Sequence, residues 1–447
     1  MKPRLILLAF ISNVLLSFTT IAQTQLSIFH EVLFYDGYAA TVSSALPPGV
    51  IRHRNDLIAR KLSSQELQSI GTTLSMKVVV KAVCDNYDRI GNVNLALVPA
   101  GATTYNPGAV SRIELGRYIT PFMNKNVMPD TVPYNYTIDN VASLLKETSL
   151  TSQYDIWIEL ELFGVPYAAN TQVAGCSGRN DVFKGSLYFT TSGPTQTQNN
   201  NFLLPLAFKK DLNNYTASAT DTMGKTTKFI QFSLPANLTN ATLYLITSNH
   251  GANSGGEEYN RRMHYIYADG NVVLQYKPGR STCEPFRVYN TQANGIYGSS
   301  PQSPSQWQSF SNWCPGDVID IRTINLNTLT AGQHSFGIRV PTAVFNGGQG
   351  NIPFSVYLQG KSTTIGLNDE SDFFTAAISA YPNPVNSILH ISSTTTLDKI
   401  KIMSLFGQEL LSSALPDIDV SAFEPGLYFI QAHTTQGQIL MSRVIKQ

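Results

Sequence analysis

The alternation of apolar and polar residues with a period of two restricts the fold of this chain most, because successive side chains point to opposite faces of a β-strand. In the clearest run, 155–162, every even position is apolar, and Trp157, Glu159 and Glu161 lie between them. A similar run occupies 77–83, and turn residues separate such runs. The pattern predicts an all-β protein of antiparallel sandwiches. Further runs lie at 227–233, 242–247, 263–276, 333–340 and 353–359.

The length of the chain, 447 residues, exceeds what one ordinary hydrophobic core organises. We predict one sandwich at 23–180, a second at 181–362, a linker at 363–374 and a smaller β-sandwich at 375–447. The one helix that we expect covers 138–145, where apolar residues recur at helical spacing.

Residues 1–22 predict an export signal. Lys2 and Arg4 supply its positive end, residues 5–16 are mostly apolar, and the small residue Ala22 ends it. A membrane anchor is the alternative, but the apolar run is short and two polar residues interrupt it. No later stretch reaches about 18 apolar residues, so we expect no membrane span in the mature chain.

Charge and cysteine content argue against two classes of function, nucleic-acid binding and zinc binding by cysteines. The formal net charge is +1 and 14% of residues are charged, without a basic stripe, which argues against a nucleic-acid partner. The cysteines are Cys84, Cys176, Cys283 and Cys314. An even number in an exported chain predicts two disulfides, with three possible pairings. No two cysteines have CxxC spacing, so we expect no cysteine-based zinc site.

The last 70 or so residues resemble the C-terminal sorting domain of the type IX secretion system of Bacteroidetes. The resemblance implies a small β-sandwich, a secreted or cell-surface location, and the secretion machinery as a partner. A partner-binding β-module is the alternative. The resemblance rests on Tyr381–Val385, Leu405–Gly407, Pro425–Tyr428 and Val444–Lys446.

The region 75–360 resembles the peptide-N-glycosidase F family through five short motifs in the same order. Cys84–Val93 is similar to the family's Cys-Asp-x-Trp-Asp-Arg segment, and Glu114–Phe122 is similar to its Glu-Ile-Gly-Arg-Phe-Ile-Thr-Pro strand. Ile156–Glu159 is similar to the strand with a family glutamate. Gly256–His264 is similar to the family's Cys-x-Glu-Trp-Cys-x-Arg-x-His motif, and Trp313–Gly316 is similar to its Trp-Cys-Pro-Gly segment.

This resemblance implies two antiparallel jelly rolls side by side and a site in the cleft between them. It implies hydrolysis of the amide that joins GlcNAc to asparagine in N-glycosylated proteins or glycopeptides, which leaves aspartate and needs no cofactor or metal. The catalytic residues carried over by position are Asp88, Glu159 and Glu258. The residues carried over for substrate binding are Tyr87, Arg89, Tyr259, Arg262 and Trp313.

The resemblance also pairs Cys283 with Cys314, and the pairing of Cys84 with Cys176 stays open. The chain departs from the family motifs at several places, including the absence of the family's arginine before Trp313 and of its cysteine before Cys84. Tyr87 and Tyr259 replace tryptophans, while Gly256 and Asn260 replace cysteines.

Less specific interpretations exist for each candidate. Asp88 with Arg89 resembles a surface turn, and Glu159 lies on a polar strand face that is ordinarily solvated. A carbohydrate-binding or adhesive jelly-roll protein that has lost catalysis is therefore an alternative. A copper monooxygenase is a second one, but its site needs clustered His and Met ligands, and the seven histidines are scattered.

Overall fold

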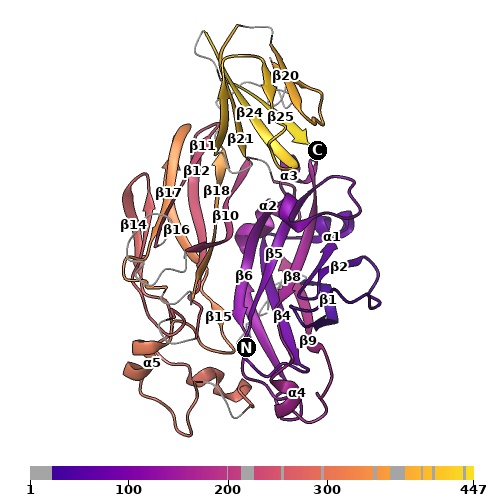
Figure 1. Ribbon diagram of the computed structural model, residues 1–447, viewed down its shortest axis with the longest axis vertical. Helices are drawn as coiled ribbons and strands as arrows, with labels where there is room; N and C mark the ends of the chain where they lie inside the picture. The colour runs from indigo at the N-terminus through magenta and orange to yellow at the C-terminus, as the bar shows by residue number, and fades with distance from the viewer. Residues whose placement is uncertain are drawn as a thin grey trace, which may run out of the picture.

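The structure, a computed structural model, describes residues 23–198, 200–212, 226–252, 256–292, 296–345, 350–362, 378–393, 396–404, 408–435 and 439–447. The predicted export signal, the predicted linker at 363–374 and the Leu405–Gly407 motif lie outside these residues. Three β-sheet units are visible in Figure 1: an indigo-to-magenta unit, a magenta-to-orange unit beside it, and a yellow unit above both.

The first unit is an antiparallel sandwich whose sheets have the strand orders β1–β9–β4–β7 and β15–β6–β5–β8–β3–β2. The strand bounds are β1 Thr24–Tyr35, β2 Val50–Arg54, β3 Leu57–Lys61, β4 Thr73–Ala82, β5 Ile90–Pro99, β6 Ser111–Ile119, β7 Thr131–Thr137, β8 Tyr154–Leu162, β9 Asp181–Ser192 and β15 Val318–Ile319. Its helices are α1 Ser64–Ser69, α2 Asp139–Leu145, where the sequence predicts a helix, α3 Thr148–Thr151 and α4 Ala169–Gln172.

The core of this unit follows the alternation in the sequence. The inward residues of β4, among them Leu74, Val78 and Val80, are fully buried, and so are Ile158 and Leu160 of β8. Burial of each such side chain contributes about 1.5–3 kcal/mol. The opposite face of β8 is also buried, with Trp157 at 3% and Glu159 at 0% exposure. The alternative interpretation, a solvated polar face, is therefore wrong for this strand, because neighbouring parts of the chain cover that face.

The second unit is also an antiparallel sandwich, with the strand orders β10–β18–β12–β16 and β11–β17–β13–β14. Its buried core includes Leu245, Ile266, Phe336 and Phe354. The strand bounds are β10 Asn201–Leu212, β11 Thr227–Leu234, β12 Leu238–Thr247, β13 His264–Ala268, β14 Asn271–Tyr276, β16 Arg322–Leu329, β17 Gly332–Arg339 and β18 Ile352–Ser362, and helix α5 covers Pro304–Phe310. The chain thus has the two jelly rolls that the resemblance implies.

Strand β6 joins the two jelly rolls. Residues of β15, which come from the second half of the chain, pair with Tyr118 and Arg117 on β6. The fully buried guanidinium of Arg117 donates to both carboxylate oxygens of Glu114, each at 2.7 Å. It also donates to Ser248 Oγ and the Pro353 carbonyl oxygen of the second roll, both at 2.8 Å. This network fixes the two rolls against each other. It therefore also fixes the relative positions of the loops at the end that the rolls share.

Substitution of Arg117 by methionine should lower the free energy of unfolding by about 3 kcal/mol, because Glu114 would remain as an unpaired buried charge. Urea unfolding of the purified protein measures the change. The double variant Glu114→Leu/Arg117→Met should unfold at higher urea than Arg117→Met alone, since it removes the orphaned charge. An Arg117→Met protein as stable as the wild type would contradict the role of this network.

The third unit packs a sheet of order β19–β20–β23 against one of order β22–β21–β24–β25 around buried residues such as Leu389, Ile402 and Ile430. The strand bounds are β19 Ile378–Tyr381, β20 Ile388–Ser393, β21 Leu397–Ser404, β22 Glu409–Ser413, β23 Asp417–Asp419, β24 Gly426–Thr434 and β25 Ile439–Lys446. Within the described residues, no helix has the length and apolar character needed to cross a membrane.

Candidate active site

Asp88 lies on the loop between β4 and β5, and this loop is anchored at its start. Cys84, two residues after β4 ends, forms a disulfide with Cys176, which follows α4. At the other end, the backbone N–H of Arg89 donates to Thr120 Oγ1 at 2.7 Å. The loop is therefore tied to α4 on one side and to the end of β6 on the other.

Asp85 holds the inside of this loop, a role that the sequence analysis missed. Its buried carboxylate accepts the backbone N–H groups of Tyr87 at 3.0 Å and Val165 at 2.8 Å. It also forms a two-point ion pair with Arg89, with Nε at 2.7 Å and Nη2 at 3.2 Å. The available signal in the sequence is an aspartate in a turn, whose side chain can accept the backbone N–H of the residue two positions later. Much of the hydrogen-bonding capacity of Arg89 is thus committed to Asp85.

The surroundings of Asp88 favour its protonated form. Burial raises the pKa of Asp88, and the nearby Glu258 carboxyl raises it further, while Arg89 opposes the rise; the result is a pKa of about 7. Asp88 Oδ2 is buried and has no hydrogen-bond partner among the described residues. A carboxyl with a pKa near neutrality and a free acceptor oxygen is suited to exchange a proton with water or substrate.

Glu258 comes from the second roll, on the loop between β12 and β13. Its backbone N–H donates to the Gly251 carbonyl oxygen at 3.2 Å, and the Gly251 N–H donates to Glu258 Oε2 at 3.0 Å. The Asn312 side-chain amide donates to the Glu258 carbonyl oxygen. Burial raises the pKa of Glu258, against the opposing hydrogen bond from the Tyr259 hydroxyl. The structure therefore brings together two of the three predicted acids, one from each roll.

Tyr259 and Trp313 form the aromatic side of the site. The pKa of Tyr259 is raised by burial and by the Glu258 and Asp88 carboxyls, so the phenol lies near both acids. The Trp313 ring lies 6.4 Å from the Tyr259 ring. Trp313 is only 6% exposed, and its indole N–H donates to the Asn249 carbonyl oxygen at 2.8 Å. Trp313 thus lies beside Tyr259, and the Tyr259 side chain is the less buried of the two.

Tyr87 and Arg262, two further predicted binding residues, have protein partners. The Tyr87 ring lies 5.7 Å from Phe122 and 5.5 Å from the Arg89 guanidinium. Arg262 forms a two-point ion pair with the buried Glu257, at 2.7 and 3.0 Å. Glu257 also accepts the Val344 N–H, so Arg262 fastens the loop that carries Glu258.

Glu159 lies apart from the two coupled acids. It pairs with Asn94 in the β5–β8 ladder, four residues along β5 from Ile90, or about 13 Å. The Glu159 carboxylate is fully buried, where it forms an ion pair with Arg112 at 3.3 Å and accepts the Tyr105 hydroxyl at 2.8 Å. The structure does not bring Glu159 to the candidate site, and its carboxylate oxygens are taken by Arg112, Tyr105 and Asn94.

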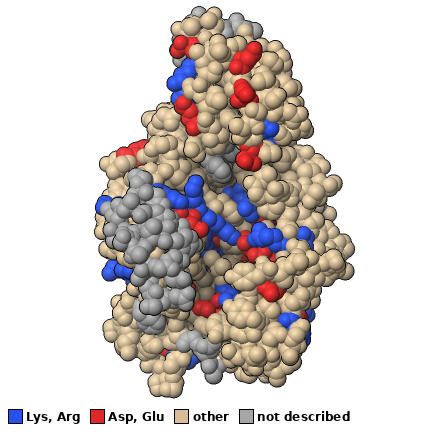
Figure 2. Space-filling model, in the orientation of Figure 1, with Lys and Arg blue, Asp and Glu red and all other residues tan. Residues whose placement is uncertain are grey.

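Charged side chains of both signs gather in the hollow between the two rolls (Figure 2). Ion pairs that cross between the rolls include that of Lys209 on β10 with Glu161 on β8, at 2.7 Å. The hollow is thus a polar cleft rather than an apolar pocket.

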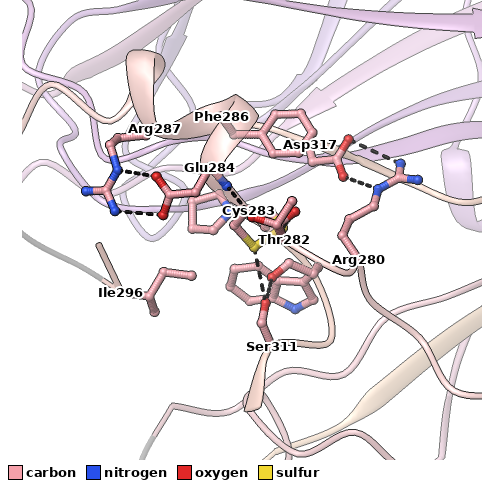
Figure 3. Close-up of a disulfide and its surroundings, with 12 residues drawn as sticks. Arg280, Thr282, Cys283, Glu284, Phe286, Arg287, Ile296, Ser311 and Asp317 are labelled. Atoms are coloured by element: carbon pink, nitrogen blue, oxygen red, sulfur yellow. Dashed lines mark hydrogen bonds and ion pairs between the residues drawn. A yellow bond between two sulfur atoms is a disulfide. The ribbon is translucent and has the colours of Figure 1, made fainter. Parts of the chain in front are cut away.

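The second disulfide stabilises a neighbouring loop. Cys283 is bonded to Cys314, the pair that the family resemblance implies. Ion pairs lie on either side of it, Glu284 with Arg287 and Asp317 with Arg280 (Figure 3). Because Trp313 directly precedes Cys314, this crosslink helps to hold the tryptophan beside Tyr259.

The histidines near the cleft have protein partners. His250 Nε2 lies 2.7 Å from Ser248 Oγ, and His264 Nδ1 lies 2.9 Å from the Arg262 carbonyl oxygen. Burial lowers the pKa of His250 to about 3 and that of His264 to about 4. In the described ranges, no group of three or more His, Cys, Asp or Glu residues is arranged to hold a metal ion.

Comparison with known families matches three ranges of the chain. A model of the N-terminal part of peptide-N-glycosidase F matches residues 25–177, and a model of its C-terminal part matches residues 215–359. The chain belongs to the peptide-N-glycosidase F family. A model of the secretion system C-terminal sorting domain matches residues 379–447. This sorting domain places the protein outside the cell or on its surface.

Two solved structures of PNGF-II share the fold. The structure of PNGF-II in one crystal form has 22% identity and a TM-score of 0.56 over 76% of this chain, and this chain spans 66% of that one. A second crystal form gives 22% identity and a TM-score of 0.54, with 78% and 66% coverage. The glycosylasparaginase PNGase F from Flavobacterium meningosepticum has 17% identity and a TM-score of 0.48, with 77% and 97% coverage. A search of curated proteins gave no match.

Proposed function

We propose that this peptide-N-glycosidase F family member is a secreted amidase that releases N-glycans from glycoproteins or glycopeptides. The bond cleaved is the amide between GlcNAc and the asparagine side chain, and the peptide product carries aspartate. The placement of Asp88 carries the proposal: its buried Oδ2 has no hydrogen-bond partner among the described residues, and burial and the Glu258 carboxyl of the other roll raise its pKa to about 7. Such tuned carboxyls are typical of hydrolytic sites.

In the proposed reaction, ionised Asp88 accepts a proton from a water molecule through its free Oδ2. The water oxygen attacks the carbonyl carbon of the glycosylated asparagine, and the carbon–nitrogen bond then breaks. The proton passes to the departing nitrogen, which leaves as the amine of the glycan, while the carbon becomes the aspartate carboxyl. Because Asp88 returns the proton that it took, one carboxyl serves as base and then as acid.

Glu258 and Tyr259 position the reactants in this scheme. The Tyr259 hydroxyl and the Gly251 N–H hold the Glu258 carboxyl in one orientation. We assign Glu258 to hydrogen-bonding of the water or of the first sugar, and Tyr259 to stacking against that sugar. These contacts supply proximity, while Asp88 supplies the proton transfer.

Incubation of the purified protein with a denatured N-glycoprotein, followed by mass analysis of the peptides, tests the proposal. We expect each former glycosylation site to carry aspartate, with the mass difference between an amide and an acid. A peptide that retains asparagine with one GlcNAc would identify an endoglycosidase instead. Intact glycopeptides that nevertheless bind to the protein would favour the carbohydrate-binding alternative.

A further inference from the structure

We propose that Ser248 and His250 are positioning residues that fix Glu258, in the second roll, relative to the roll that carries Asp88. The inference rests on the proposed function, because it concerns the relative placement of the same two acids. Both residues belong to the segment 248–251, which directly follows β12 and ends seven residues before Glu258. Hydrogen bonds tie this segment to the first roll at one end and to the Glu258 carboxyl at the other.

Ser248 ties the segment to the first roll. The fully buried guanidinium of Arg117 on β6 donates to Ser248 Oγ through Nη1, at 2.8 Å. Strand β6 also leads to the Asp88 loop, because Thr120, directly after β6, accepts the backbone N–H of Arg89. The path from Asp88 to Ser248 therefore runs along one strand.

The hydroxyl proton of Ser248 determines the state of the His250 ring. Ser248 is 1% exposed, and its Oγ lies 2.7 Å from His250 Nε2. Because Arg117 can only donate, Ser248 Oγ accepts from it, and the buried hydroxyl proton is left to donate to Nε2. The ring is then neutral and carries its proton on Nδ1. Burial and the Arg117 charge lower the pKa of His250 to about 3, which agrees with a neutral ring.

The end of the segment passes this placement to Glu258. His250 exchanges two backbone hydrogen bonds with Asn351, of 2.9 and 3.1 Å, directly before β18. The next residue, Gly251, donates to Glu258 Oε2 at 3.0 Å and accepts the Glu258 backbone N–H at 3.2 Å. Glu258 is thus held at two points by the neighbour of a residue whose ring Ser248 orients. A shift of this segment would displace the carboxyl that we assign to the water or the first sugar.

Ser355 offers a matched comparison within the same buried network. It lies on β18, is 3% exposed, and donates its hydroxyl to Glu114, the ion-pair partner of Arg117. Both serines therefore contribute a hydroxyl to the joint between the rolls. Ser248 differs from Ser355 because its segment also holds Glu258. If both hydroxyls served only the joint, loss of either one should have similar effects.

A double-mutant cycle on an N-glycopeptide, measured well below the melting temperature of each variant, tests the inference. Ser248→Ala should lower kcat/KM roughly 10- to 100-fold, because small displacements of a positioned group have effects of this size. In the Glu258→Gln background, Ser248→Ala should lower kcat/KM by less than about threefold, since its effect acts through the Glu258 carboxyl. Ser355→Ala should keep kcat/KM within about threefold of the wild type.

Nitrogen NMR of the histidine rings and of the backbone amides gives a readout that needs no turnover. In the wild type, His250 should show an unprotonated Nε2 and a protonated Nδ1 near neutral pH. Ser248→Ala removes the proton donor to Nε2, so it should change the ring signals and shift the amide signals of Gly251 and Glu258. Ser355→Ala should leave these signals in place.

Equal losses of activity in Ser248→Ala and Ser355→Ala would overturn the inference, and so would fully additive losses from Ser248→Ala and Glu258→Gln. A protonated Nε2 on His250 would overturn it as well. The NMR arm separates this inference from the proposed function. An inactive wild type whose Gly251 and Glu258 amides still shift in Ser248→Ala would refute the amidase and support the positioning of Glu258 by Ser248.

Discussion

Substitution of Asp88 by asparagine should lower kcat/KM on an N-glycopeptide by about 10²–10⁴-fold, the usual contribution of a general base. The variant keeps the shape of the side chain and removes its ability to accept a proton. Glycopeptide binding should survive, because stacking on Tyr259 does not depend on the Asp88 charge. Steady-state kinetics on a defined glycopeptide, together with calorimetric binding, measure both effects.

The same variant should be more stable than the wild type at alkaline pH. Because the pKa of Asp88 rises from its ordinary 3.8 to about 7 on folding, the folded state disfavours the ionised form. The wild type should therefore lose stability as the pH rises from about 4 to about 7, by at most about 4 kcal/mol. Asparagine avoids this loss, so Asp88→Asn should melt higher than the wild type at pH values above about 7. At pH values below about 4, the two proteins should melt alike.

The pH profile of the wild type follows from the same pKa. If Asp88 acts as the base, kcat/KM should rise with pH through about 7 as the carboxyl ionises.

Asp85→Asn is the contrasting variant in the same loop, because it removes the partner of Arg89 and should lose stability and activity together. An Asp88→Asn protein with near-normal turnover would refute the proposed mechanism.

Removal of the Cys84–Cys176 disulfide should cost about 4–5 kcal/mol of stability, since it closes a loop of 92 residues. The double variant Cys84→Ser/Cys176→Ser should also lose activity below its melting temperature. The reason is local: Cys84 begins the segment that carries Asp85 and Asp88, so the crosslink sets where that segment starts. Thermal unfolding and kcat/KM at a temperature well below the transition measure the two effects separately.

Cys283→Ser/Cys314→Ser is the matched control for that experiment. It opens a shorter loop of 31 residues, and should cost slightly less stability, about 4 kcal/mol. This crosslink helps to hold Trp313 beside Tyr259, so its loss should weaken glycan binding while proton transfer by Asp88 persists. Equal kinetics of both double variants and the wild type would contradict the positioning roles of the disulfides.

Strand patterns predicted the fold because they report local geometry. The alternation along β4 and β8 identified the residues of the core, such as Val78 and Ile158, and motif order indicated the two jelly rolls. The burial of the other face of β8 could not be read in the same way. It depends on which distant parts of the chain pack over Trp157 and Glu159, and alternation carries no information about that.

In the candidate site, too, the sequence located the residues that local structure fixes, but not the contacts that depend on distant parts of the chain. Motifs located Asp88 and Glu258. Both acids lie on loops fixed by local turns, so the motif around each acid is enough to indicate its position. Glu159, Arg262 and Trp313 also lie in motifs, but their partners Arg112, Glu257 and Asn249 decide what they do. The partners of Glu159 and Trp313 are set by tertiary contacts, so residue type alone could not show that Arg112 pairs with Glu159 or that the Asn249 carbonyl holds Trp313. Glu257 lies in the same motif as Arg262, five residues before it.

Cleavage of an N-glycopeptide in heavy-oxygen water tests the central claim most directly. If Asp88 directs water to the asparagine side-chain carbonyl, the peptide released by the wild type should carry one heavy oxygen in a new aspartate carboxyl. The Asp88→Asn protein should leave the glycopeptide intact over the same time. A released peptide that still contains asparagine, or labelled aspartate formed equally fast by Asp88→Asn, would contradict the claim.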